Sequence, residues 1–320
     1  MFLFSSGFTR RVLISLTLAG ASLAAHAADT ATLRVGDQRG GTRALLEASG
    51  QLKDLPYKIE WADFPNAAPL LEALRANAVD VGGVGDAPLL FAQAAGAPVR
   101  GVSAIRSGSH GVAIVANANS PLRDAASLKG KRIATTRGSI GHYLVIAALQ
   151  KAGLKPSDVT LVFLGPSDAK AALASGDVDA WSTWDPYVAI AQVNDHAKVI
   201  ADGAGLMSGL SFEAANEDAI HNKRAALADF LRRQAVSIQW ALTHPDDYAQ
   251  IQAKITGLSV AVHKFAAERA KTQPVAIDQK VIAEQQKTAD AWFAAGVVPT
   301  RINATQGLDS SFNATTTAAR

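Results

Sequence analysis

Short apolar runs alternate with amphipathic segments over the first two thirds of the chain. The apolar runs are rich in β-branched residues and predict strands, and the segments between them have the spacing of helices. Alternation on this scale predicts parallel sheets of the α/β class. The expected strands cover residues 33–35, 58–61, 79–84, 99–104, 111–116, 132–135, 159–163, 180–182 and 198–200, and the expected helices cover 42–48, 67–75 and 87–95.

The last third of the chain shows helical spacing alone. From residue 216 onward, Leu227, Phe230, Leu231 and Ile238 form an apolar stripe, which predicts a helix that covers a core. The tail from about Arg301 is rich in Thr, Asn, Ser and Ala. A polar chain end of this kind predicts a mobile terminus.

The two series of strands and helices resemble each other. The pair Val79-Asp80 recurs 99 residues later as Val178-Asp179, and each copy reads helix, Val-Asp strand, aspartate, helix. Self-similarity at a fixed offset indicates an internal duplication. We therefore expect two similar α/β units within one chain.

Two such units predict two lobes with mostly parallel sheets and two hinge crossovers, in the manner of a two-lobed binding protein. We expect lobe I to be discontinuous and lobe II to be inserted into it, because helical signals alone follow the second series. The expected boundaries are 28–106 plus 213–320 for lobe I and 107–212 for lobe II.

The first 27 residues have the pattern of a secretory signal peptide. Arg10 and Arg11 precede the uncharged apolar run 12–25, and a small-x-small cleavage pattern ends at Ala27. The run is shorter than the roughly 20 residues that a spanning helix needs. Cleavage near Ala27 predicts a periplasmic protein. The paired arginines also fit a twin-arginine signal, so the export route stays open.

Composition excludes several kinds of function. Removal of the signal peptide leaves 29 basic and 28 acidic residues, without the clustered basic side chains that nucleic-acid binding requires. The chain has no cysteine, which excludes disulfides, thiolate metal sites and a cysteine nucleophile. No phosphate-binding loop, dinucleotide fingerprint, nucleophile elbow or HExxH motif occurs. We therefore expect no cofactor, no metal and no catalytic residue.

Four expected helix starts are candidates for a shared binding site. Ligands of open α/β sheets bind beyond the carboxyl ends of the strands, where helix N-termini offer unpaired N–H groups and a partial positive charge that favour an anion. Gly41, Thr42, Gly85, Gly138 and Ser139 are candidate contacts, and ordinary caps and turns are the alternative interpretation. The four turns are residues 40–42, 85–87, 138–140 and 184–186.

Two aspartates complicate an anion site. Asp86 and Asp185 follow the duplicated strands, and a carboxylate beside an anion repels it. We expect both to cap helices through backbone N–H groups; the alternative is contact with an amine on the ligand. Gln38, after the first strand, is a candidate amide donor.

Aromatic and histidine side chains complete the candidate set. Trp181 and Trp184 flank the end of one expected strand, so one can face the core and the other the cleft. Trp184 is the candidate for packing against an apolar ligand tail, with a core position as the alternative. His110 and His142 are candidate donors.

Six segments of the chain carry a family resemblance: 36–38 (GDQ), 84–88 (VGDAP), 128–134 (LKGKRIA), 138–144 (GSIGHYL), 178–181 (VDAW) and 184–186 (WDP). With them the chain resembles the periplasmic substrate-binding proteins of aliphatic sulfonate importers, within the sulfonate, taurine and nitrate group, over nearly its whole length after the signal peptide. The resemblance implies a type II periplasmic-binding fold and an ABC permease and ATPase as partners. It also implies anion contacts from Gln38, Gly85, Asp86, Gly138 and Ser139, with His142 nearby.

We therefore expect a monomer that captures alkanesulfonates between two lobes and delivers them to an importer for sulfur acquisition. Gly40 and Gly41 replace the aromatic residue that some relatives carry after the first strand, which leaves the preferred alkyl length open. The rival ligands are taurine, nitrate and other small oxyanions. A biosynthetic enzyme of the thiamine-pyrimidine type shares the fold but uses a cysteine-rich segment that is absent here. A protein that also serves a chemoreceptor is the remaining alternative.

Overall fold

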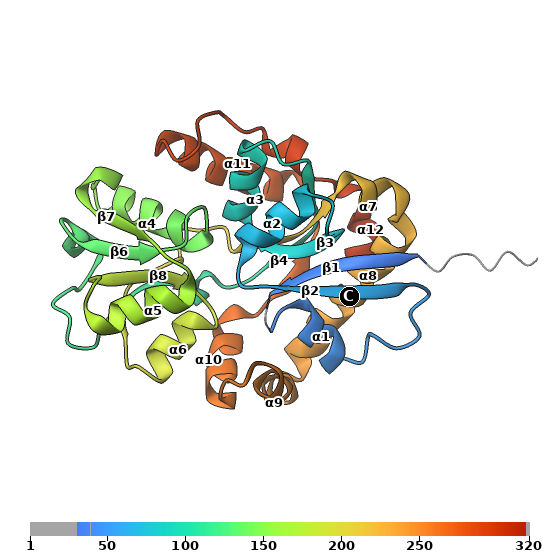
Figure 1. Cartoon of the computed structure of the whole chain (residues 1–320), viewed down its shortest axis with the longest axis horizontal. Helices are drawn as coiled ribbons and strands as arrows, with labels where there is room; N and C mark the ends of the chain where they lie inside the picture. Colours follow the sequence, from blue (N-terminus) through green and yellow to red (C-terminus); the bar gives the residue numbers. More distant parts are fainter. Residues whose placement is uncertain (1–30, 39, 318–320) are drawn as a thin grey trace, which may run out of the picture. The chain divides into compact units, whose positions relative to one another are not determined.

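The strands of this chain form two sheets, each flanked by helices (Figure 1). The structure is a computed structural model and describes residues 31–38 and 40–317. The expected signal peptide, residues 1–27, lies outside the described residues. Among the residues that the structure does describe, no helix is long and apolar enough to cross a membrane.

The first sheet takes strands from both ends of the described chain. In hydrogen-bonded order it contains β11 (Gln273–Val275), β4 (Val99–Arg106), β10 (Leu210–Asn216), β3 (Val81–Gly85), β1 (Thr32–Gln38) and β2 (Lys58–Phe64). β10 and β11 run against the other four strands. Its helices are α1 (Thr42–Ala48), α2 (Ala67–Arg75), α3 (Asp86–Ala94), α7 (Glu217–Asn222), α8 (Arg224–Thr243), α9 (Pro245–Thr256), α10 (Val260–Ala270), α11 (Gln279–Ala294) and α12 (Asn313–Thr317).

The second sheet is formed by the middle of the chain. Its hydrogen-bonded order is β7 (Thr160–Phe163), β6 (Arg132–Thr135), β8 (Ala180–Trp184), β5 (Val112–Ala116) and β9 (Lys198–Asp202). Only β5 runs against its neighbours among these strands. Three helices follow β6, β7 and β8, namely α4 (Ile140–Lys151), α5 (Pro166–Ser175) and α6 (Tyr187–Val193). In strand direction both sheets are mostly parallel, as expected.

The two sheets repeat one arrangement, which confirms the duplication. The order β2-β1-β3-β10-β4 matches β7-β6-β8-β5-β9, and in both an antiparallel strand comes fourth. The repeated aspartate has the same local role in each copy. Asp80 Oδ2 accepts a hydrogen bond from the backbone N–H of Arg34 at 2.7 Å, and Asp179 Oδ2 accepts one from that of Arg132 at 2.8 Å. Each aspartate thus ties the third strand of its repeat to the first.

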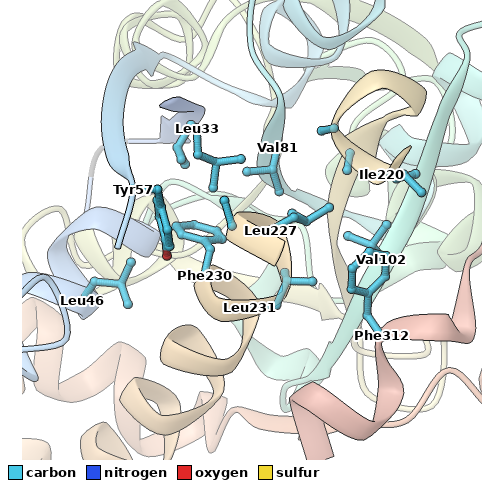
Figure 2. Packing of buried hydrophobic residues seen from close by; sticks show 14 residues of the cluster. Leu33, Leu46, Tyr57, Val81, Val102, Ile220, Leu227, Phe230, Leu231 and Phe312 are labelled. Atoms are coloured by element: carbon cyan, nitrogen blue, oxygen red, sulfur yellow. The ribbon is translucent and has the colours of Figure 1, made fainter. Parts of the chain in front are cut away.

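The apolar stripe of the C-terminal third packs on the first sheet (Figure 2). Leu227, Phe230 and Leu231 of α8 are fully buried and belong to one cluster with Leu33 of β1 and Val81 of β3. Burial of each such side chain contributes about 1.5–3 kcal/mol. The helical prediction for this segment is therefore confirmed.

The prediction of a mobile tail is wrong for the part of the tail that the structure describes. Phe312 is 1% exposed and packs in the α8 cluster, and Leu308 is 8% exposed in a second cluster. The side chain of Asn313 accepts a hydrogen bond from the backbone N–H of Ile277 at 2.9 Å. Two large apolar side chains are enough to hold an otherwise polar segment on the core.

Two strands are absent from the prediction. β10 reads LSFEAAN, in which alanine, asparagine and glutamate have low strand propensity, yet it pairs with β3 and β4 on both sides. β11 has three residues, contains Pro274 and lies at the edge of the sheet, where proline is tolerated. Tertiary pairing creates both strands against their local sequence.

Candidate functional site

Four helix entrances, two from each sheet, line one cavity of about 1190 Å3. They follow the carboxyl ends of β1, β3, β6 and β8, which is where open α/β sheets bind ligands. The structure therefore brings the four predicted turns together. The cavity lining includes these predicted site residues: Gln38, Gly41, Thr42, Gly85, Gly138, Ser139, Trp184 and Asp185.

The entrance of α1 already holds a carboxylate of the chain. Asp37 Oδ1 accepts a hydrogen bond from the backbone N–H of Thr42 at 2.8 Å. Burial raises the pKa of Asp37 to about 6, against the opposing effect of the backbone donors at this helix end. The hydroxyl of Thr42 donates to Glu213 Oε1 at 3.1 Å. At the α1 entrance, the backbone N–H and the hydroxyl of Thr42 therefore already have acceptors within the chain.

A carboxylate of the chain also accepts a backbone hydrogen bond at the entrance of α6. Asp185 Oδ1 accepts a hydrogen bond from the backbone N–H of Ala189 at 3.0 Å, which confirms the expected capping. Both oxygens of Asp185 also accept bonds from Arg269 of α10, one of them from Nε at 2.8 Å. Burial raises the pKa of Asp185, and Arg269 opposes that rise. Because Arg269 balances this charge, the carboxylate does not act as a bare negative group in the cavity.

The entrances of α3 and α4 meet, and the first turn of α3 is held by its own Asp86, whose Oδ1 accepts a hydrogen bond from the backbone N–H of Ala87 at 2.7 Å. Gly85 precedes α3 and makes no side-chain cap, and a Cβ on Gly85 would lie 2.5 Å from Cγ2 of Ile140 at the start of α4. Ser139 Oγ accepts a hydrogen bond from the backbone N–H of His142 at 3.1 Å. The N–H of Ile140, the first residue of α4, has no partner inside the helix. One entrance from each sheet therefore touches the other, where the side chain of Ile140 packs against Gly85 at a separation that only glycine permits.

Asp86 lies outside the cavity lining. It is 1% exposed, and its carboxylate accepts hydrogen bonds from Ser208 Oγ at 2.7 Å, the backbone N–H of Ala87 at 2.7 Å and Thr288 Oγ1 at 3.4 Å. Burial raises its pKa against these three donors. Asp86 joins the start of α3 to α11, and its carboxylate has its donors without a ligand.

Neither predicted histidine lines the cavity. His110 has a side chain 58% exposed, and its Nδ1 lies 2.8 Å from Asp202 Oδ2. His142 is 2% exposed and lies between the rings of Phe163 and Trp292, at centroid distances of 5.1 and 4.9 Å. Burial lowers the pKa of His142 to about 4, so its ring is neutral near pH 7. Its Nδ1 accepts a hydrogen bond from the backbone N–H of Gly138 at 3.2 Å, which helps to fix the α4 entrance.

The remaining predicted residues form walls of the cavity. Gln38 lies at the end of β1, and its Nε2 donates to the carbonyl of Gly83 at 2.9 Å. Trp181 is 1% exposed in the core, whereas Trp184 lines the cavity beside Tyr187, with ring centroids 6.1 Å apart. The two tryptophans are three positions apart on one strand and so face opposite sides.

Glu213 is a cavity residue that the sequence did not reveal. It lies on β10 and is 4% exposed. Its Oε1 accepts hydrogen bonds from Thr42 Oγ1 and Gln234 Nε2, whereas its buried Oε2 has no partner. Burial raises the pKa of Glu213 to about 7. A glutamate among apolar residues in the alternating run of β10 was the available signal, and it went unused because no strand was predicted there.

Two cationic side chains that line the cavity have partners within the chain. Arg137 lies over the ring of Phe163 at 3.7 Å from the centroid, and Lys264 pairs with Asp246 at 2.7 Å. Among the described residues, no three or more His, Cys, Asp and Glu side chains come together in a group that could hold a metal ion.

Comparison with known proteins identifies the family. Residues 61–248 match the family model described as NMT1/THI5 like. The chain is 34% identical over 307 residues to a putative aliphatic sulfonates-binding protein of Escherichia coli, which covers 93% of this chain and 96% of that protein. It is 32% identical over 151 residues to the taurine-binding periplasmic protein of the same organism, which covers 47% of this chain and 46% of that protein.

A solved structure supports the same assignment. The alkanesulfonate-binding protein SsuA from Xanthomonas axonopodis pv. citri, bound to MOPS, superposes with a TM-score of 0.81 at 32% identity, over 88% of this chain and 99% of that one. The periplasmic-binding fold expected from the sequence is thereby confirmed. These relatives are binding proteins. The chain belongs to the NMT1/THI5-like family and, within it, is a relative of the aliphatic sulfonate-binding proteins.

Proposed function

We propose that this chain is a periplasmic solute-binding protein that captures an alkanesulfonate and delivers it to an ABC importer for sulfur acquisition. The observation that carries the proposal is the meeting of two helix entrances, one from each sheet, at Gly85 and Ile140. Helix N-termini favour anions without a salt bridge. The relatives named for sulfonates, and the one bound to the sulfonate MOPS, support the same ligand class.

The proposed anion contacts lie at the α3 and α4 entrances, around Gly85 and the backbone N–H of Ile140. Gly138 and Ser139 form the turn that holds the α4 entrance, because their backbone N–H groups donate to His142 Nδ1 and to the carbonyl of Thr136. The entrances of α1 and α6 carry Asp37 and Asp185 and serve as walls, together with Gln38, Gly41, Thr42 and Trp184. Asp86, His110 and His142 act from outside the cavity, through the helices and turns that they hold. A sulfonate is anionic at every ordinary pH, and the neutral ring of His142 adds no titration near pH 7.

We further propose that the ligand closes two lobes, residues 28–106 plus 213–320 and residues 107–212. Ser107 and Gly209 lie where the chain crosses between the sheets, and the backbone N–H of Ser107 donates to the carbonyl of Gly209 at 2.9 Å. Gly209 has a φ of +71°, and a Cβ there would lie 2.2 Å from the carbonyl oxygen of Ser107. Such close, hydrogen-bonded crossings suit a hinge.

The proposal includes the cellular setting. The signal peptide is removed near Ala27, and the mature protein works as a monomer in the periplasm with an ABC permease and its ATPase. It catalyses no reaction. The basis for this part of the proposal is that its relatives are named as binding proteins.

Isothermal titration calorimetry on the mature protein tests the function. Butane-1-sulfonate and pentanoate, which have the same alkyl tail, are titrated separately. We expect the sulfonate to bind and the carboxylate to bind at least about 10-fold more weakly, because a tetrahedral oxyanion accepts more hydrogen bonds than a planar one. Absence of binding for every alkanesulfonate tried would overturn the function.

Gly85→Ala connects the binding to the proposed contacts. The added methyl group meets Ile140, so we expect affinity for butane-1-sulfonate to fall at least about 10-fold. Gly165→Ala is the matched control, because Gly165 also precedes a helix, α5, and a Cβ there meets nothing within 4 Å. Equal losses in both variants would contradict the proposed contacts.

A further inference from the structure

One oxygen of Glu213 is buried and has no hydrogen-bond partner among the residues that the structure describes. Oε1 accepts from Thr42 and Gln234, and Oε2 has neither a donor nor contact with solvent. Leaving a buried carboxylate oxygen unpaired is costly. A buried, unpaired carboxylate oxygen in the wall of the cavity is suited to a donor that the ligand brings.

The surroundings of Glu213 are negative. Among the described residues, no Lys, Arg or His forms an ion pair with Glu213 or with Asp37, the carboxyl group that faces it from β1. The groups from α1 and α8 are the neutral side chains of Thr42 and Gln234. Asp185 differs, because Arg269 balances its charge. A positively charged group on the ligand would neutralise the carboxylate of Glu213, as Arg269 does for Asp185.

The strand register fixes how far Glu213 lies from the proposed anion contacts. On β10, Ser211 pairs with Gly85 and Glu213 pairs with Gly83, so the two sites are separated by two strand positions, or about 7 Å. Side chains two positions apart lie on the same face of a strand, and both Ser211 and Glu213 line the cavity. A sulfonate with two or three carbons before its amine spans roughly 4 to 5 Å, and the carboxylate side chain covers the remainder.

We infer that Glu213 binds the ammonium group of the ligand, so that this chain prefers short ω-aminosulfonates over sulfonates with a plain alkyl end. The inference rests on the proposed function, because the sulfonate must be held at Gly85 and Ile140 for the amine to reach Glu213. It also replaces the earlier candidates for an amine contact, since Asp86 lies outside the cavity lining and Asp185 is paired with Arg269.

Calorimetry with matched ligand pairs tests the inference at pH 8 in buffers that contain no sulfonate. The pairs are ethanesulfonate with taurine and propane-1-sulfonate with 3-aminopropane-1-sulfonate. We expect the amine to improve affinity about 10- to 100-fold within at least one pair, the range for a hydrogen bond to a charged group. Glu213→Gln keeps the shape and the acceptor for Thr42, and it should remove the preference while the plain sulfonate still binds.

Glu268→Gln is the control for loss of negative charge. Glu268 is an exposed acid on α10 beside the same cavity, and its variant should keep the preference within about twofold. Thermal melting of each variant establishes that it is folded. A preference that survives in Glu213→Gln, or that disappears equally in Glu268→Gln, would overturn the role of Glu213.

The unaltered protein provides an independent readout. Titration at pH 7 in two buffers with different ionisation enthalpies measures proton release, and binding of an ammonium group next to the partly protonated Glu213 should release about half a proton. Plain sulfonates should release none. If plain sulfonates bind as tightly as the aminosulfonates and without a difference in proton release, the inference fails and the proposed function stands. If no sulfonate binds, the proposed function itself fails.

Discussion

The two repeats of this chain share a backbone plan and use their helix entrances in opposite ways. In the first repeat, the entrance after the first strand carries Asp37, and the entrance after the third strand has no cap from Gly85 and holds Asp86 outside the cavity lining. In the second repeat, the entrance after the first strand is capped by the hydroxyl of Ser139, and the entrance after the third strand carries Asp185. Each repeat therefore has one entrance that we propose for the anion and another that Asp37 or Asp185 covers.

The difference shows that a duplicated motif does not fix a duplicated role. Asp80 and Asp179 both tie strands together. Asp86 and Asp185 diverge, since Asp86 is buried against α11 and Asp185 is held by Arg269 at the cavity. The structural aspartates share one partner, the backbone N–H of the first strand, because that strand lies inside each repeat. The second pair depends on C-terminal helices that have no counterpart in the second sheet.

The largest expected effect comes from making the α4 entrance resemble that of α1. Ser139→Asp retains a good helix cap and adds a negative charge where we propose that the sulfonate binds. We expect affinity for butane-1-sulfonate to fall at least about 100-fold, measured by calorimetry. Ser259→Asp is the control, because Ser259 caps α10 and is absent from the cavity lining. Unchanged affinity in Ser139→Asp would refute the distinction between the two kinds of entrance.

The second prediction concerns the unpaired acid of the first repeat. Burial raises the pKa of Glu213 from 4.5 to about 7, so the folded protein holds a proton that the unfolded chain has lost. Stability should therefore fall as the pH rises from about 4.5 to 7, by roughly 3 kcal/mol from this group. Asp37, whose pKa rises from 3.8 to about 6, acts in the same direction at lower pH.

Chemical denaturation at pH 4.5, 6 and 7.5 measures this loss. Glu213→Gln should remove most of the decrease above pH 6, where Asp37 contributes little. A saturating amount of 3-aminopropane-1-sulfonate should restore stability at pH 7.5 in the unaltered protein. A variant that loses stability with pH as steeply as the unaltered protein would contradict the assignment to Glu213.

The third prediction compares the structural aspartates. Asp80 has a side chain 0% exposed and is bound by Arg34 at 2.5 Å and Lys223 at 2.7 Å. Burial favours a higher pKa for Asp80, but these partners outweigh it, and the pKa lies below its ordinary value. Asp80→Asn should lower the free energy of unfolding by about 2–3 kcal/mol, measured by chemical denaturation. The side chain of Asp179 is 39% exposed, so Asp179→Asn should lower the free energy of unfolding by less than about 1 kcal/mol.

The stabilisation from Asp80 also has a pH signature. Because its pKa is lower in the folded state, its contribution is complete above the ordinary pKa of 3.8 and is lost as the pH falls through the folded value. The difference in unfolding free energy between the unaltered protein and Asp80→Asn should therefore be smaller at pH 3 than at pH 5 in denaturation curves. Equal costs for Asp80→Asn and Asp179→Asn at pH 5 would contradict this account of the repeats.

The smallest expected effect is at His110. Its side chain is exposed and paired with Asp202, away from the cavity lining. His110→Ala should change the affinity for butane-1-sulfonate by less than about twofold between pH 5 and pH 8. A larger change in calorimetry would return His110 to the set of ligand contacts.

The local pattern of the sequence was sufficient for much of the fold. The helices 42–48 and 67–75 have the predicted bounds, because their apolar spacing and the turns before them act within a few residues. The four turns were predictable as a group because the duplication and the rule for carboxyl strand ends place them together. The convergence of Gly85 and Gly138 on one cavity follows from that topology.

What the sequence did not reveal depends on contacts between distant segments. The strand β10 is held by β3 and β4 rather than by its own propensity, and Glu213 was hidden with it. The pairing of Arg269 with Asp185 joins residues 84 positions apart, and no local pattern announces it. Asp37 was visible in the sequence, but its turn back to the N–H of Thr42 appears only when the first strand and α1 are in place.

A crystal structure of the mature protein with an alkanesulfonate tests the central claim most directly. The account predicts a sulfonate between the α3 entrance at Gly85 and the α4 entrance, with an oxygen within hydrogen-bond distance of the backbone N–H of Ile140. A sulfonate bound at the entrances of α1 or α6, or outside the cavity, would contradict it.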